Sequence, residues 1–342
     1  MGNKLITSYA GFPSFFNAPI VEPEKVEEGM TVVAGVPIDH GVVVGRPGAR
    51  YGPRGIREAS VLSRGAYEVS AENTLLDVES GVFMKPRADS GLADVGDFHV
   101  NPTSVSETTA TVIEGVSNIV RRGGFPVILG GDHYVAYPGF AGFAAGMAER
   151  KPDLRLGYLH IDSHPDLRDV HGVGGRFTHG TQVRRISEER YVTFRNMAWI
   201  GLNGSVVDPA QYRIFKSEGA KVITARAVQE RGPEDVVRDA LDHIAQGVDA
   251  VYVSVDIDVV DGSHSPGTGA FVFSGITAPE FLGMMEALAT HDVVGAIDMC
   301  EVAPPLDSTG RTAQLAASGL LAALNRRLFD EVEVDGSTHG DL

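Results

Sequence analysis

The chain has 342 residues, of which 43% are hydrophobic and 22% charged, and its formal net charge is −16. This composition is typical of a globular protein, and the acidic balance argues against a nucleic-acid partner, which would require a basic surface. No apolar run approaches the roughly 18 residues of a membrane span. Cys300 is the one cysteine, so no internal disulfide can form, and the N-terminus lacks a signal-peptide pattern; both features predict a cytoplasmic location.

Apolar runs that predict strands alternate with segments that predict helices. The strand-like runs are TVVAGV (31–36), FPVILGG (125–131), LRLGYLHID (154–162), MAWIGL (197–202), KVITA (221–225), AVYVSVDID (250–258) and VVGAIDMCEV (293–302). The helix-like segments include residues 104–123, 233–247 and 277–291. This alternation predicts parallel βαβ units and the α/β class. Since no Pro/Ser-rich linker divides the chain, we expect one domain at 31–328, an N-terminal extension at 1–30 and an acidic C-terminal tail at 329–342.

Metal-ligand side chains follow three of the predicted strands. In HIDSHPDL, residues 160–167, Asp162, His164 and Asp166 alternate, so all three leave one face where the strand ends. A polar loop with one histidine would explain this stretch alone. However, YVSVDIDVVD repeats the pattern at 252–261, and PVILGGDHY sets a histidine behind a third strand at 126–134. The carboxyl ends of parallel strands share one edge of the sheet, which is where ligands bind.

Together these strand ends supply four carboxylates and two imidazoles. One ordinary zinc site takes about four ligands, so the set is too large for a single zinc ion. It suits two divalent ions about 3.5–4 Å apart that share carboxylates. The six candidate metal ligands are His133, Asp162, His164, Asp166, Asp256 and Asp258.

The order of these motifs resembles that of the ureohydrolases, which comprise arginases, agmatinases and related amidinohydrolases. The resemblance rests on GGDH (130–133), DSHPD (162–166) and SVDIDVVD (254–261), and it covers roughly residues 32–327. It extends to GRPGARYGPRGIREAS, FTHGTQVRR, SPGTG and IDMCEVAPPLD, of which the first two look like the agmatinase branch. The resemblance implies a three-layer α/β/α sandwich around a mostly parallel eight-stranded sheet, commonly assembled as trimers or hexamers.

The resemblance also implies a role for each candidate residue. One ion would be held by His133, Asp162, Asp166 and Asp256, and the other by Asp162, His164, Asp256 and Asp258. Manganese(II) suits this oxygen-rich set, with nickel(II) as the alternative. His179 matches the mobile acid–base histidine of the family, and Glu301 matches the glutamate that holds the substrate guanidinium.

The chemistry follows from the two ions. They would lower the pKa of a shared water from 15.7 towards about 7, and the resulting hydroxide would attack the guanidinium carbon to give urea and an amine. Asp166 would steer the hydroxide and pass its proton to the departing nitrogen. Of the neighbouring residues, we expect Asp132 to cap the next helix or orient a ligand, and His160 to pack behind the ligands rather than join them.

The substrate tail is where the resemblance to arginases ends. The segment LRDVHGVGGRFT, residues 167–178, lacks the polar residues with which arginases hold an amino acid head. Val42–Val44, Phe271 and Phe273 either pack in the core or form an apolar entrance. We therefore expect a small cationic guanidino substrate without an α-amino acid head, either agmatine-like or a guanidino acid. A guanidine or biguanide hydrolase that uses nickel is the alternative.

Two other classes of protein are alternatives for this sequence. A zinc deacetylase would share the three-layer fold but use one zinc ion with fewer ligands, and the six-ligand set argues against it. A non-catalytic partner subunit should have lost ligands, and this chain keeps all six. We expect a homo-trimer or hexamer, with a hetero-oligomer that contains a related subunit left open.

Overall fold

The computed structural model describes residues 11–66, 74–78, 81–87, 91–204 and 208–333. Residues 1–10 of the expected N-terminal extension and 334–342 of the expected acidic tail therefore lie outside the described residues. No helix in the described part of the chain is long and apolar enough to cross a membrane.

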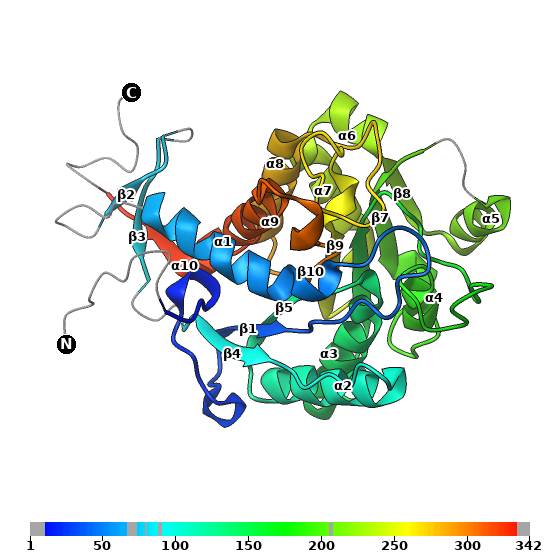
Figure 1. Ribbon diagram of the computed structural model, residues 1–342, viewed down its shortest axis with the longest axis horizontal. Coiled ribbons are helices and arrows are strands. Elements are labelled where there is room, and N and C mark those ends of the chain that lie inside the picture. Colours follow the sequence, from blue (N-terminus) through cyan, green and yellow to red (C-terminus); the bar gives the residue numbers. More distant parts are fainter. Residues whose placement is uncertain (1–10, 67–73, 79–80, 88–90, 205–207, 334–342) are drawn as a thin grey trace.

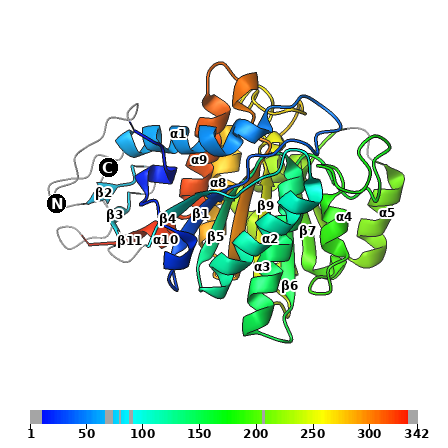
Figure 2. The ribbon, with the colours of Figure 1, turned by 60° about the horizontal axis from the view of Figure 1, so that its bottom comes forward.

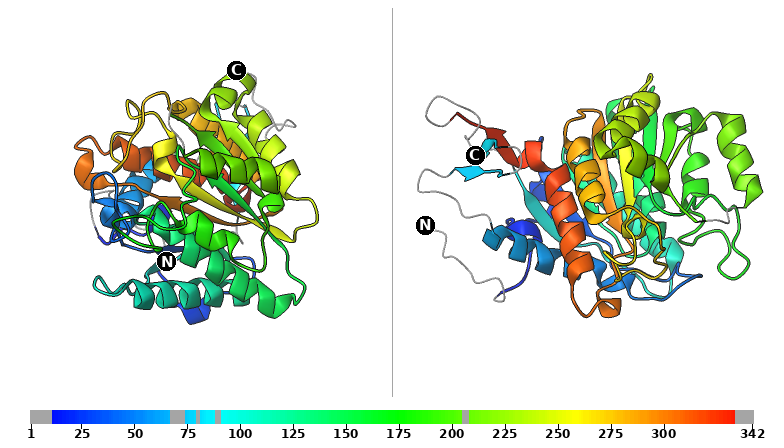
Figure 3. Two further views of the ribbon diagram at one scale, coloured as in Figure 1. Left: turned by 90° about the vertical axis from the view of Figure 1, so that its right-hand side faces the viewer. Right: turned by 90° about the horizontal axis from the view of Figure 1, so that it is seen from above.

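An eight-stranded parallel sheet occupies the centre of the protein (Figure 1). Its strands lie in the order β4-β1-β5-β10-β9-β6-β7-β8, and Figure 3 shows that the sheet is twisted. The strands are β1 (Thr31–Gly35), β4 (Ala93–Asp97), β5 (Phe125–Leu129), β6 (Leu156–Ile161), β7 (Met197–Leu202), β8 (Lys221–Thr224), β9 (Ala250–Asp256) and β10 (Val294–Cys300). Seven of them fall on the predicted apolar runs. Strand β4 was not predicted, because its sequence ADVGD is too polar to read as a buried strand.

Helices cover both faces of this sheet, which gives the expected three layers (Figures 1 and 2). One face carries α1 (Gly52–Ala66), α6 (Ala225–Arg231), α7 (Pro233–Ile244), α8 (Ala278–Ala289) and α9 (Arg311–Ala323). The other carries α2 (Val105–Arg121), α3 (Ala136–Arg150), α4 (Gln182–Ser187) and α5 (Pro209–Glu218). The three predicted helices are confirmed as α2, α7 and α8. Helix α8 begins with a capping box, in which Thr277 and Glu280 bond each other's backbone N–H groups.

A smaller antiparallel sheet lies at one end of the molecule, beside α1 and α10 (Asn325–Leu328) (Figure 1). It comprises β2 (Leu75–Leu76), β3 (Phe83–Pro86) and β11 (Phe329–Glu331). Strand β11 pairs with β3, so the first three residues of the expected acidic tail form part of a sheet. The polar sequence of this segment gave no indication that its backbone pairs with β3.

The described part of the N-terminal extension packs against the edge of the main sheet. Phe15 is fully buried, and its backbone N–H donates to Asp94 in β4 over 2.9 Å. Arg57 of α1 reaches the same carboxylate over 2.8 Å and also pairs with Asp97. This buried ion pair joins the extension, the first helix and the edge strand.

Candidate metal centre

The predicted ligands gather at the carboxyl ends of four adjacent strands, β5, β10, β9 and β6, in the middle of the sheet. All these strands are parallel and almost wholly buried, so the polar residues that follow them emerge at one edge. His133 follows β5, Glu301 follows β10, Asp256 ends β9 with Asp258 two residues on, and Asp162, His164 and Asp166 follow β6. The expectation that these strand ends meet is confirmed.

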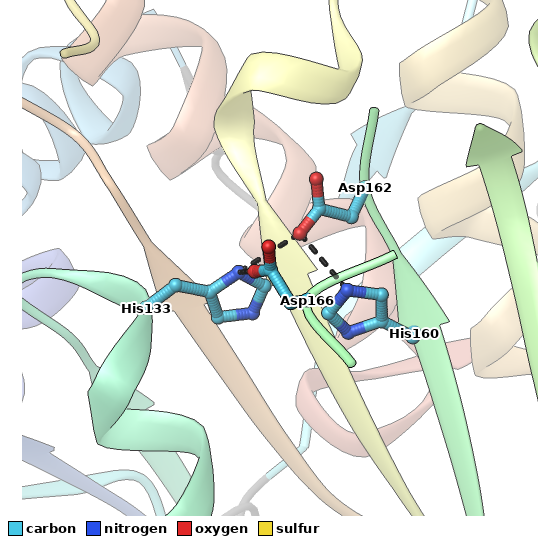
Figure 4. A group of neighbouring side chains, drawn as sticks. All are labelled: His133, His160, Asp162 and Asp166. Carbon is cyan, nitrogen blue, oxygen red and sulfur yellow. Dashed lines mark ion pairs between the residues drawn. The ribbon is translucent and has the colours of Figure 1, made fainter. Parts of the chain in front are cut away.

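One half of the cluster surrounds the His133 imidazole (Figure 4). Its Nδ1 atom lies 3.0 Å from Asp162 Oδ2, 3.2 Å from an oxygen of Asp256 and 3.3 Å from one of Asp166. Nδ1 of His133 and Oδ2 of Asp162 are buried, yet neither has a hydrogen-bond partner of acceptable geometry among the described residues. Since buried polar atoms are costly without a partner, these atoms fit a shared cation.

The other half surrounds the His164 imidazole. Its Nδ1 atom lies 3.1 Å from Asp258 Oδ2 and 3.4 Å from Asp162 Oδ1. The two oxygens of Asp162 therefore face two different imidazoles, which is the arrangement of a carboxylate that bridges two ions. Asp162 and Asp256 are also held alike, because the Oδ1 of each accepts the backbone N–H two residues on, from His164 over 2.6 Å and from Asp258 over 2.7 Å.

The electrostatics of the cluster favour a cation. Burial raises the pKa of Asp256 well above its usual range, and it raises the pKa of Asp258 to about 6 although His164 opposes the shift. Burial would also raise the pKa of Asp162, but the neighbouring His160 and His133 hold it well below its usual range. Several carboxylates buried together are unfavourable as anions, and divalent cations relieve that cost.

A buried relay that the sequence did not reveal stands behind His133. Its Nε2 atom lies 2.9 Å from the Ser254 hydroxyl, which donates to Asp298 Oδ1 over 2.8 Å. If Nδ1 faces a cation, Nε2 must carry the proton and donate to Ser254. The relay would then fix the tautomer and the orientation of the ring. Polar residues inside fully buried strands were the available signal for Ser254 and Asp298.

Two further residues hold the ligands in place. His160 is fully buried, stacks on His133 with ring centroids 4.9 Å apart, and sets its Nε2 2.9 Å from Asp162 Oδ2 (Figure 4). This is the packed position expected for it. Gln182, at the start of α4, donates to Asp166 Oδ2 over 2.5 Å and was not singled out from the sequence. Both contacts restrict the carboxylate that they touch.

Glu301 connects the cluster to His179 and, through His179, to the backbone of Val43 and Val44. Its Oε1 accepts the His133 N–H over 2.8 Å and lies 3.1 Å from His179 Nδ1. The backbone N–H groups of Val43 and Val44 both point at His179 Nε2 over 3.3 Å. Burial opposes protonation of His179, but the Glu301 carboxylate outweighs it and raises the pKa of His179 to about 9. The N–H groups of Val43 and Val44 oppose protonation of His179, because they donate to a lone pair on Nε2.

The backbone at two candidate catalytic residues is strained. Asp166 and Glu301 have φ angles of 47° and 62°, a region that costs a non-glycine residue about 1–3 kcal/mol. The Glu301 N–H donates to the Gly131 carbonyl over 2.9 Å, and a Cβ on Gly131 would lie 1.8 Å from the Ile38 carbonyl oxygen. Glycine is therefore required at 131 for the turn that supports Glu301 and leads to His133.

Asp132 shows the expected capping role. It is fully buried, and its two oxygens accept the N–H groups of Tyr134 over 3.0 Å and of Gly41 over 2.7 Å. Burial and the nearby Glu301 raise the pKa of Asp132 to about 7. Asp132 thus ties the backbone at Gly41 to the turn that carries His133.

A cavity of about 220 Å³ opens onto the cluster. It is lined at the cluster by Asp166, His179, Asp256, Asp258 and Glu301, and its outer part carries the exposed residues Val44, Arg168 and Asp208. Val43, His171, Gln211 and Ala270 also line it. The expectation of an apolar entrance is thus correct for two valines only. Phe271 and Phe273 are 40% and 73% exposed and pack against each other, so they neither belong to the core nor line this cavity.

Comparisons with known proteins identify the family of the chain. Residues 30–324 match the model of the Arginase family. The chain is 32% identical to the mitochondrial guanidino acid hydrolase of Homo sapiens, over 94% of this chain and 84% of that protein. It is also 32% identical to the guanidinopropionase of Pseudomonas aeruginosa, over 93% and 92%. The structure of proclavaminate amidinohydrolase from Streptomyces clavuligerus superposes with a TM-score of 0.75 at 27% identity, over 94% and 99%. The chain belongs to the Arginase family.

Proposed function

We propose that this protein hydrolyses the guanidino C–N bond of a small compound without an α-amino acid head, giving urea and an amine, with the help of two divalent ions. The observation that carries the proposal is Asp162, whose two oxygens face the Nδ1 atoms of His133 and His164. Membership of the Arginase family supports the reaction type, and relatives named for guanidino acids support the substrate class.

Each residue has a part that its contacts support. Two divalent ions, when bound, would lower the pKa of water towards about 7. Asp166 borders both the cluster and the cavity, and Gln182 holds it, so it is suited to carry a proton to the leaving nitrogen. Glu301 lines the cavity and would hold the guanidinium by charge-assisted hydrogen bonds. His179 is suited to exchange that proton with solvent.

The preferred metal is manganese(II). Four carboxylates and two imidazoles make an oxygen-rich ligand set, which hard divalent ions favour, whereas the order of affinities lets nickel(II) compete. Family membership argues against a zinc deacetylase, and the complete ligand set argues against a non-catalytic subunit. A homo-oligomeric enzyme is part of the proposal. The cytoplasmic location stays a prediction, since one relative is named as mitochondrial.

A metal-loading and product assay tests this proposal. The protein would be stripped of metal, reloaded with manganese or nickel, and given 4-guanidinobutyrate, agmatine, guanidine or a biguanide, with urea and amine both measured. We expect metal-dependent product formation, and its loss in Asp166→Asn, which keeps the size of the side chain. The half-buried Val43 beside the cavity keeps guanidine and biguanides in the panel, because an apolar wall suits a short or apolar tail. Absence of product from every guanidino compound in both metal forms would refute the proposal.

A further inference from the structure

Arg168 stands at the outer part of the cavity, two residues after the candidate ligand Asp166. Two residues of chain span at most about 7 Å, so the Cα atoms of Arg168 and Asp166 are close. The backbone here is fixed on both sides. Leu167 N–H donates to the buried Gln211 side chain over 3.2 Å, and Arg168 N–H donates to the Gly180 carbonyl over 3.2 Å. Arg168 is therefore anchored at the cavity wall although its side chain is exposed.

The acidic residue that follows Arg168 in the sequence is paired elsewhere. Asp169 Oδ1 accepts from Arg176 over 2.9 Å and from the buried Arg185 over 2.5 Å. These two arginines also contact Glu188, so the four side chains form a network that excludes Arg168. The Asp169 carboxylate is therefore engaged by Arg176 and Arg185 and not by Arg168.

The other carboxylates near Arg168 are engaged as well. Asp166 belongs to the metal cluster and accepts from Gln182, while Asp208 accepts the Ala210 N–H at the start of α5 over 2.9 Å. Among the described residues, no hydrogen bond or ion pair to the Arg168 guanidinium is found. The cavity thus has an anionic inner end that suits a guanidinium and an unpaired cation on its outer wall.

We propose that Arg168 binds a carboxylate at the far end of the substrate and thereby selects guanidino acids over agmatine. This inference rests on the proposed function and names the substrate class of the same site. A guanidinium presents two parallel N–H groups to a carboxylate, which gives directional, charge-assisted bonds. The terminal ammonium of agmatine would meet the same cation and be repelled. Asp208 also lines the cavity, but its Oδ1 accepts the Ala210 N–H, whereas no partner of the Arg168 guanidinium is found among the described residues.

Three substrates with one guanidino group and different tails separate the effects: 4-guanidinobutyrate, agmatine and butylguanidine, whose tail is uncharged. In Arg168→Met we expect kcat/KM for 4-guanidinobutyrate to fall about tenfold, mainly through KM, which corresponds to 1.4 kcal/mol. Butylguanidine should stay within twofold, and agmatine should not fall. Arg168→Lys should restore part of the loss, because it returns the charge without the fork. Arg213→Met is the matched control, because Arg213 is exposed on α5 and is not among the residues that line the cavity.

The outcomes distinguish this inference from the proposed function. If wild-type enzyme cleaves butylguanidine but prefers agmatine to 4-guanidinobutyrate, the inference is wrong and the proposed reaction stands. An equal loss for all three substrates in Arg168→Met, or no loss for 4-guanidinobutyrate, would also overturn the inference alone. If the metal-loaded wild-type enzyme cleaves none of the three, the inference is wrong, and the proposed function fails with it when guanidine and biguanides are not cleaved either.

Discussion

The relay behind His133 makes a sharp prediction for Ser254→Ala. This change removes the hydroxyl that lies 2.9 Å from His133 Nε2, and it leaves the nearby carboxylate of Asp298 without the donor at 2.8 Å. All three side chains are fully buried, so water does not replace the missing hydroxyl without rearrangement. The Nε2–H would have no acceptor, and the imidazole would no longer be held with Nδ1 towards the cluster.

Two estimates of the free energy lost in Ser254→Ala agree. Leaving one buried donor without a partner costs about 1–3 kcal/mol. Losing a residue that orients a metal-binding histidine typically costs about 10–100-fold in affinity, which is about 1.4–2.8 kcal/mol. We therefore expect Ser254→Ala to weaken the binding of one of the two ions about 10–100-fold. Asp298→Asn, which keeps an oxygen opposite Ser254, should have a smaller effect.

Competition between the protein and a fluorescent chelator for manganese would measure both dissociation constants. Ser117→Ala is the matched control, because Ser117 is also buried but belongs to α2 on an outer layer. Thermal unfolding of each variant would show whether the fold persists. If Ser254→Ala binds both ions within twofold of the Ser117→Ala control, either Nδ1 is not a ligand atom or the tautomer is set by another group.

Three further predictions follow from the site and the fold. Elemental analysis of metal-loaded protein should find about two ions per chain, and His164→Asn should lower the occupancy of one ion and cut turnover; a single tight zinc, or unchanged turnover in the variant, would contradict this. Arginine should be at least about a hundredfold poorer in kcat/KM than the best guanidino compound, because residues 167–178 lack the polar groups with which arginases hold an amino acid head, and each 1.36 kcal/mol of lost binding is a factor of ten. Burial opposes ionisation of Asp307, but hydrogen bonds from Thr309 and Thr312 outweigh it and lower its pKa to about 2. Asp307→Ala should therefore cost about 1–3 kcal/mol at neutral pH. That cost should persist above the unfolded pKa of 3.8 and fade as the pH falls towards 2, in urea unfolding at a series of pH values; a cost independent of pH would count against the carboxylate.

The central strands could be predicted from the sequence because parallel strands covered on both faces read as continuous apolar runs. Strand β4 lies at the sheet edge, where its aspartates pair with Arg57, and such a polar strand has no local signature. Strands β2 and β11 have two and three residues, so their pairing with β3 depends on contacts distant in the sequence. For β2, β4 and β11, the local sequence does not indicate which distant residues each strand pairs with.

The same division applies to the site. The ligands could be predicted because alternation along one strand sets the face on which each residue emerges, and the carboxyl edge is shared. The relay could not be predicted, because it depends on register between strands. Asp298 pairs with Ser254, and Ser254 pairs with His160, so three polar residues from β10, β9 and β6 form one row directly beneath the cluster. Each residue alone is only a polar position in a buried strand, and its function depends on that row.

Arg168 extends this reasoning from the fold to the substrate. Its own sequence neighbourhood, between Asp166 and Asp169, suggests a solvated residue with acidic partners. Only the folded chain assigns Asp169 to Arg185 and Asp166 to the metal cluster, which leaves the cation to the cavity. A charge whose neighbours are already paired is available to a ligand, and a carboxylate is the ligand that a guanidinium binds best. The tail of the substrate should therefore be selected by Arg168, while the shared carboxylates select the reacting group.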